Sequence, residues 1–288
     1  MLLTKYFSWR ITPMNTNTNS SRLDKPTIEY IKSLARQKHV EYRKLNDVIS
    51  TQIFNILELN SKVLYYPLED NDVWGFCDTI SGQTFVCINT SISYDKQVFA
   101  AAHELYHLWF DKENEVLLSS ALEEIEGQDT ISLNELKANR FAAEFLVEEN
   151  LLRQEMTLYS LNKDSLDIDN ILKLADIFLV PYKTMVKRLR EIEIINDNKY
   201  VKLISYPKSE IEIWRKRLGL RLPDVDNFIK LDNLINRAME LYEQKLITLD
   251  KLEYILSFAK LTPDQLGVEQ PPKFIPPTDI ELQAILEE

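Results

Sequence analysis

The chain has 288 residues, of which 45% are apolar and 27% charged, with only five glycines. A chain of this length can bury a substantial core, and this composition is typical of a helix-rich globular protein rather than a disordered or fibrous one. The formal net charge of −11 gives no overall basic surface for a nucleic-acid backbone, so direct nucleic-acid binding is disfavoured. Two cysteines, Cys77 and Cys87, make no disulfide framework, and we expect packed thiols in a reducing compartment.

The N-terminal stretch begins with apolar residues, but Lys5, Ser8 and Arg10 interrupt them before a signal-peptide core of about 7–15 residues can form. No run of about 18 apolar residues occurs in the chain. We therefore expect a cytoplasmic protein without membrane attachment. The polar stretch 15–21 predicts that residues 1–21 form a flexible lead.

The first folded elements are expected to be helices. Pro26 suits a first helical turn, and the apolar residues after it recur at helical spacing, namely Ile28, Ile31, Leu34 and Ala35. A second helix is predicted over residues 45–57. Residues 63–68, 74–80 and 83–89 are short runs rich in β-branched and aromatic residues, with Ser81 and Gly82 between the last two. This pattern predicts a small sheet that ends in a hairpin.

A helical pattern without Gly or Pro runs from Asp95 to about Phe110. Residues 112–130 are acidic and irregular, and a long helix is predicted from Leu133 to Glu149. The opening of that helix, from Ser132 to Glu135, matches the S-x-x-E capping box.

Two helices at residues 168–178 and 181–192, joined by Leu-Val-Pro, indicate a helix-turn-helix-like unit. Its last helix carries four basic side chains, namely Lys183, Lys187, Arg188 and Arg190. A DNA-reading helix is conceivable, but the acidic chain favours a solvated face on a packing module. Amphipathic segments at residues 211–218, 226–244 and 248–260 then precede a proline-rich tail.

The run His103-Glu104-Leu105-Tyr106-His107 is the HExxH motif. Two histidines four residues apart lie on one helix face, where both can bind one metal ion. Glu104 lies about 100° away around the helix, so it can accept a proton from a metal-activated water without being a ligand. We therefore predict a zinc site with Glu104 as the general base.

A catalytic zinc site needs a third protein ligand. The only other histidine, His39, lies far upstream and is expected to be an ordinary surface residue. A carboxylate after His107 is the better candidate. The candidates are Asp111, Glu113, Glu115, Glu123, Glu124, Glu126 and Glu135. Of these, only Glu135 opens a long helix with apolar residues spaced to pack against the motif helix.

Residues 135–146, ELKANRFAAEFL, resemble the E-x-x-A-N-x-F-A-x-x-L-L signature of the ImmA/IrrE family of metallo-endopeptidases, and the separation of 28 residues from His107 also fits. The resemblance covers about residues 26–195. It implies that Glu135 is the third zinc ligand and that Asn139 hydrogen-bonds near the site. Two departures are Tyr106, where a glycine is frequent, and the absence of a proline after Leu146.

The resemblance implies an α+β fold. Residues 22–160 would form a zincin-like core in which a small sheet packs on the HExxH helix. A helix-turn-helix-like segment at 161–198 and a mostly helical region at 199–288 would follow. The family also suggests a protein substrate, typically a helix-turn-helix repressor encoded nearby, whose cleavage controls genes of mobile elements, phages or stress responses.

Two points stay open at the level of the sequence. The donor that stabilises the oxyanion has four candidates, namely Tyr94, Tyr106, Asn139 and Arg140. The alternative to an enzyme is a non-proteolytic regulatory protein that acts on the same fold by binding a partner or DNA. The intact motif favours the enzyme, because a binding module has no use for a base beside an open metal position.

Overall fold

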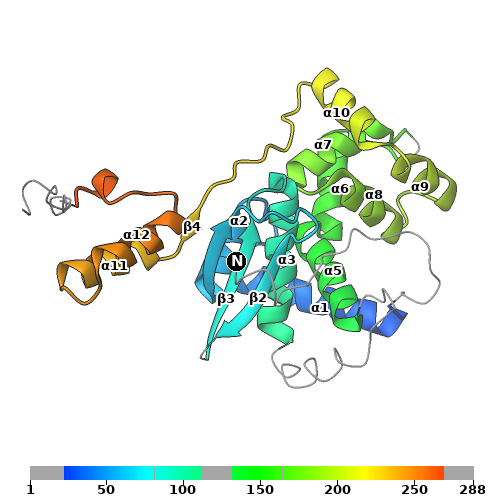
Figure 1. Ribbon diagram of the computed structural model, residues 1–288. Helices are drawn as coiled ribbons and strands as arrows, with labels where there is room; N and C mark the ends of the chain where they lie inside the picture. The colour runs from blue at the N-terminus through cyan, green and yellow to red at the C-terminus, as the bar shows by residue number, and fades with distance from the viewer. Residues whose placement is uncertain (1–22, 81, 112–131, 164, 269–288) are drawn as a thin grey trace, which may run out of the picture. The chain divides into compact units, whose positions relative to one another are not determined.

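The computed structural model describes residues 23–80, 82–111, 132–163 and 165–268 (Figure 1). The expected N-terminal lead, the acidic stretch 112–130 and the proline-rich tail lie outside these residues. The helices are α1 (Lys25–Glu41), α2 (Gln52–Asn60), α3 (Tyr94–Phe110), α5 (Leu133–Leu146), α6 (Glu149–Leu158), α7 (Ile168–Phe178), α8 (Tyr182–Glu191), α9 (Asp197–Ile204), α10 (Lys208–Arg217), α11 (Leu234–Glu243), α12 (Leu249–Phe258) and the 3-10 turn η1 (Asp264–Leu266). The strands are β1 (Lys62–Tyr66), β2 (Gly75–Ile80), β3 (Gln83–Asn89) and β4 (Lys230–Leu231).

The expected α+β class and the small sheet are confirmed. The order of the strands is β2-β3-β1-β4, with β1 parallel and β2 antiparallel to β3. Ile80 is paired with Gln83 across the predicted hairpin, and Gly82 has a φ of +76°, a conformation that glycine adopts without a steric penalty. The alternation of buried and exposed side chains on β1 shows that one face of the sheet is covered.

The motif helix α3 packs against β2 and β3 and also against α5, which in turn packs against α1 (Figure 1). Helix α3 has buried side chains on nearly every side, including three consecutive alanines at 100–102 that are fully buried. Small side chains allow the neighbouring strands and helices to approach the backbone closely. The HExxH motif of α3 therefore lies among packed elements rather than on a surface helix.

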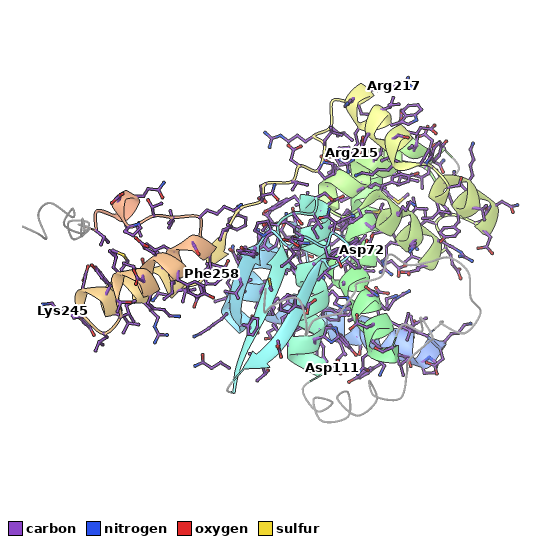
Figure 2. The ribbon with its side chains drawn as sticks, in the orientation of Figure 1. Asp72, Asp111, Arg215, Arg217, Lys245 and Phe258 are labelled. Carbon is purple, nitrogen blue, oxygen red and sulfur yellow. The ribbon has the colours of Figure 1, made fainter. Side chains whose placement is uncertain are left out.

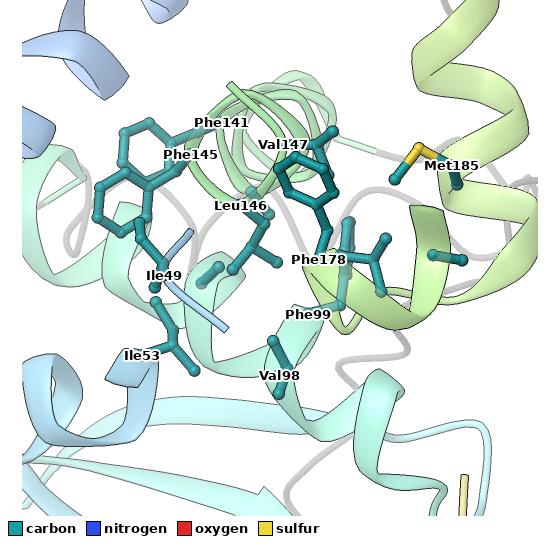
Figure 3. Packing of buried hydrophobic residues seen from close by; sticks show 14 of the residues in the cluster. Ile49, Ile53, Val98, Phe99, Phe141, Phe145, Leu146, Val147, Phe178 and Met185 are labelled. Atoms are coloured by element: carbon teal, nitrogen blue, oxygen red, sulfur yellow. The ribbon is translucent and has the colours of Figure 1, made fainter. Parts of the chain in front are cut away.

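One hydrophobic core extends from the sheet to α7 and α8. Figure 3 shows side chains from both ends of this core, among them Val98 of α3, Phe145 of α5 and Met185 of α8. The rings of Phe141 and Phe145 are stacked with their centroids 5.3 Å apart. Helices α7 and α8 thus share the core of the motif helix.

Two helix boundaries differ from the expectation. The predicted helix 45–57 begins only at Gln52, because the chain turns at Ser50, which has a φ of +45°. The predicted helix 133–149 ends at Leu146, because the Glu148 side chain accepts the Leu151 N–H and thereby caps a new helix. Both differences arise where a turn or a cap interrupts a continuous apolar pattern.

The chain divides into a unit up to Lys230 and a second unit from Leu231 onward. In the second unit, α11 and α12 pack around Ala238, Leu252 and Leu256. In the first unit, residues 224–228, here called the returning segment, bind next to the start of α3. The Tyr94 N–H donates to the Asp224 carbonyl (3.2 Å), and the Asn227 N–H donates to the Thr90 carbonyl (3.2 Å).

Cys77 and Cys87 lie on the paired strands β2 and β3, where both are thiols, as expected. Burial, followed by the nearby charge of Glu104, raises the pKa of Cys87 to about 12. None of the helices within the described ranges has the length and apolarity that crossing a bilayer requires.

Candidate metal centre

His103 and His107 lie one turn apart on α3 and face the same point. Their ring centroids are 5.0 Å apart, and their Nε2 atoms are separated by 3.1 Å. His103 is 1% exposed, whereas His107 is partly exposed. The spacing that was read from the sequence therefore brings the two imidazoles together.

Glu135 reaches the same point from α5. Its Oε2 lies 3.0 Å from the His103 Nε2, and its Oε1 lies 3.3 Å from the His107 Nε2. The Ser132 hydroxyl accepts the Glu135 N–H, which is one half of the expected capping box. The Glu135 carboxylate points to the two histidines instead of back to Ser132. Ser132 therefore fixes the backbone of Glu135, while the Glu135 carboxylate remains available to the site.

The other nitrogen of each ring is held by an oxygen. The His103 Nδ1 lies 3.1 Å from the Asn139 Oδ1, and the His107 Nδ1 lies 2.8 Å from the Asp111 Oδ2. When Nδ1–H donates to these oxygens, the lone pair of each Nε2 faces inward, which is the tautomer that a metal ligand requires. Two nitrogen lone pairs and a carboxylate then converge, and such a set of acceptors needs a cation between them.

The electrostatics agree with this requirement. Without a metal ion, His107 itself carries the positive charge: burial opposes the charged imidazole, but hydrogen bonds to Asp111 and Glu135 outweigh it and raise its pKa to about 10. Burial likewise opposes the charged carboxylate of Glu135, yet the hydrogen bonds from His103 and His107 lower its pKa well below the usual range. The donor set fits a bound metal ion, since N and O ligands of this kind suit zinc.

Glu104 lies beside this cluster but is not among the residues whose ligand atoms converge. Its side chain is 3% exposed, and burial raises its pKa even though His103 and His107 oppose that shift. Gly75 at the start of β2 leaves room for it, because a Cβ at Gly75 would lie 3.4 Å from the Glu104 Oε1 and 3.0 Å from the Cys87 carbonyl oxygen. A raised pKa suits a group that accepts and returns a proton near neutral pH.

The remaining ligand candidates lie elsewhere. The expectation that His39 lies on the surface is wrong: it is buried, and its two ring nitrogens lie 2.9 Å from the Lys44 and Phe145 carbonyl oxygens. Asp111 is the hydrogen-bond partner of His107, a role that the sequence analysis missed although its spacing of four residues from His107 was visible. The other candidates lie outside the described residues, namely Glu113, Glu115, Glu123, Glu124 and Glu126.

The four candidates for the oxyanion donor are all engaged in other contacts. Asn139 binds His103, and Arg140 forms ion pairs with Glu144 and Glu191. The ring of Tyr106 packs against Phe110 and Phe141. The ring of Tyr94 packs against Phe54, near the far end of α3.

Two of the four basic residues of α8, Arg188 and Arg190, are held in ion pairs, and the pair of Arg188 is buried. Arg188 is 1% exposed and donates to both carboxylate oxygens of Glu144, with one N–H···O distance of 2.8 Å, and to the Val147 carbonyl at 2.9 Å. Arg190 is paired with Asp197 at 2.7 Å. Burial lowers the pKa of Lys187 to about 8. A DNA-reading helix needs these charges on its surface, so α8 is poorly suited to that role.

A small mixed sheet, an HExxH helix packed on it and a third donor from the next helix are the features of a metallopeptidase domain. Residues 57–190 match the family model of the IrrE N-terminal-like domain, which supports a metallopeptidase domain of the ImmA/IrrE type in this part of the chain.

Comparisons with whole proteins are less informative. A solved structure described as a Mycobacterium tuberculosis transcriptional regulator is similar at 13% sequence identity, with a TM-score of 0.39. The match covers 56% of this chain and 46% of that chain, so this chain spans less than half of its length. No curated protein matches the chain significantly in sequence.

Proposed function

We propose that this protein is a zinc-dependent endopeptidase in which His103, His107 and Glu135 hold the metal and Glu104 is the general base. One observation carries the proposal: the two Nε2 atoms and the Glu135 carboxylate converge within 4.8 Å, and the outer oxygens of Asn139 and Asp111 turn both lone pairs inward. We also propose that residues 22–160 form a zincin-like core and that residues 161–198 form its helix-turn-helix-like segment.

The side chains have distinct tasks in this reaction. Zinc, when bound, supplies a Lewis acid that polarises a carbonyl and activates a water. Glu104 accepts the proton of the attacking water and passes it to the departing amine, so the peptide bond is cleaved without a covalent intermediate. The buried surroundings of Glu104 keep its carboxylate close to the proton affinity that this transfer needs.

The substrate that we propose is a regulatory protein, such as a helix-turn-helix repressor encoded beside this gene, whose cleavage changes the expression of a mobile element, a phage or a stress response. This substrate rests on the family resemblance. Action through DNA is less well supported, because Arg188 of α8 is buried in an ion pair with Glu144 and Arg190 is paired with Asp197 at the surface.

Zinc analysis and two variants test the proposal. We expect about one zinc per purified chain and its loss in His103→Ala. Glu104→Gln should keep the zinc and lose cleavage of the neighbouring regulator, as followed by mass spectrometry of the fragments. Glu193→Gln, an exposed position after α8, is the matched control and should cleave normally.

The outcomes separate the two classes of function. A wild-type protein with far less than one zinc, and with unchanged behaviour in His103→Ala, would exclude the metal site. A Glu104→Gln variant that retains the biological effect would instead support a regulatory protein that acts by binding.

A further inference from the structure

Asp111 directly follows the last residue of α3 (Figure 2). Its side chain makes two contacts that involve different parts of the metal centre. Its Oδ2 accepts the His107 Nδ1–H at 2.8 Å, and its Oδ1 accepts the Asn134 Nδ2–H at 2.9 Å. Asn134 is the residue directly before Glu135 on α5. One carboxylate therefore joins the histidine at the end of one helix to the first turn of the next.

The contact between Asp111 and His107 fixes which ring nitrogen of His107 carries a hydrogen. A carboxylate can only accept, so the Nδ1 of His107 must carry the proton and its Nε2 must face His103 and Glu135. Asn139 holds His103 with a neutral amide, whereas Asp111 holds His107 with an acid. A carboxylate behind a ligating imidazole fixes its orientation and raises its basicity, so His107 is the stronger donor of the pair.

The contact between Asp111 and Asn134 helps to place Glu135, the third proposed metal ligand. Asp111 and Asn134 are 23 positions apart in the chain, and this hydrogen bond joins them directly. Ser132 caps the same turn through the Glu135 N–H, so two side-chain hydrogen bonds fix the first turn of α5. Glu135 projects from that turn, and its distances of 3.0 Å and 3.3 Å to the two histidines depend on where the turn lies.

We infer that Asp111 is a positioning residue that couples the orientation of His107 to the placement of Glu135, so that the two donors are presented to a metal ion together. This inference rests on the proposed metal site and deepens it. Without Asp111 the ring of His107 can turn or change its tautomer, and the first turn of α5 loses its tie to α3. Such second-layer partners change metal affinity by about 10- to 100-fold when they are removed.

A pair of substitutions tests the coupling. Asp111→Ala removes both acceptor oxygens and so breaks the hydrogen bonds to His107 and to Asn134. The double variant Asp111→Asn with Asn134→Asp keeps both hydrogen bonds, because the new amide accepts the His107 N–H through its oxygen and donates its N–H to the new carboxylate, with the charge moved to the other helix. We expect Asp111→Ala to weaken zinc binding by about 10- to 100-fold and the double variant to retain most of the affinity.

The measurements are the zinc affinity, from competition with a chromophoric chelator, and the ¹⁵N chemical shifts of the His107 ring in the zinc-loaded protein, which report which ring nitrogen binds the metal and which carries the proton. Asp95→Asn is the matched control, because it removes the same charge from the opposite end of α3, about 24 Å away at 1.5 Å per residue. It should leave both readouts unchanged.

The result that would overturn the inference is a wild-type protein that binds zinc while Asp111→Ala binds it equally well with the same ¹⁵N shifts of the His107 ring. Failure of the double variant to retain affinity would also contradict the coupling, provided that circular dichroism shows it to be folded. If the wild-type protein binds no zinc at all, the proposed metal site itself fails, and the two failures are thereby distinguished.

Discussion

Loss of the Glu144 carboxylate should destabilise the protein strongly. Glu144 of α5 is 3% exposed and accepts hydrogen bonds from both terminal nitrogens of Arg188 and from Arg140. Arg188 is itself fully buried, so Glu144→Ala leaves a guanidinium in the core with only Glu191, at 3.3 Å, and the Val147 carbonyl. Breaking one side of such a buried pair costs about 3–5 kcal/mol, and we expect a loss of unfolding free energy in this range.

Urea unfolding followed by tryptophan fluorescence measures this loss, because all four tryptophans precede Leu231 and report on the first unit. Glu149→Ala is the control: its pair with Arg153 is 2.9 Å long but partly exposed, which predicts a loss of about 1 kcal/mol or less. The double variant Glu144→Leu with Arg188→Met should recover most of the stability, since it removes both buried charges. A loss below about 1 kcal/mol in Glu144→Ala would refute the buried, desolvated pair on which this reasoning depends.

Two further predictions concern the surroundings of the site and a basic residue of α8. Gly75→Ala should lower the unfolding free energy by about 1–3 kcal/mol and reduce cleavage without loss of zinc. The reason is that the added Cβ would press on the Cys87 carbonyl and the Glu104 carboxylate. Thermal melts measure the loss of stability, and zinc analysis shows whether the metal is retained. Burial lowers the pKa of Lys187 to about 8 in the folded protein, whereas a lysine in the unfolded chain has a pKa of about 10.4. Between these two values the unfolded chain binds more protons than the folded one, so the unfolding free energy rises with pH across that window. Lys187→Met should remove that rise, which urea midpoints at pH 8 and pH 10 measure; an unchanged slope would show that Lys187 is not desolvated.

Much of the architecture could be predicted from local patterns. The apolar spacing gave the bounds of the helix 168–178 correctly, and the β-branched runs gave the strands, because each of these signals lies within one element. The end of α5 could not be read from periodicity, since the apolar pattern continues and only the cap formed by Glu148 stops the helix. The turn at Ser50 could not be predicted either, because the apolar pattern continues through it.

In the site, too, contacts within one helix could be predicted from the sequence, whereas contacts between elements could not. The spacing of His103 and His107 was sufficient to bring their rings together, because four residues return to the same helix face. The role of Asp111 depends on Asn134, which meets it only through tertiary packing. The ion pairs that engage Arg140 and Arg188 connect α5 to α8 and could not be seen in either segment alone.

The returning segment also has a consequence for the order of folding. Thr90 donates its hydroxyl hydrogen to the Phe228 carbonyl across 138 residues of sequence, whereas the hairpin of β2 and β3 closes over a few residues. Closing so long a loop costs more chain entropy, so the first turn of α3 should be completed after the hairpin has formed. The amide hydrogens of Tyr94 and Asn227, which donate across this contact, should exchange with solvent together and faster than that of Val86 in the middle of the sheet. The start of α3 then opens reversibly while His103 and His107 stay packed.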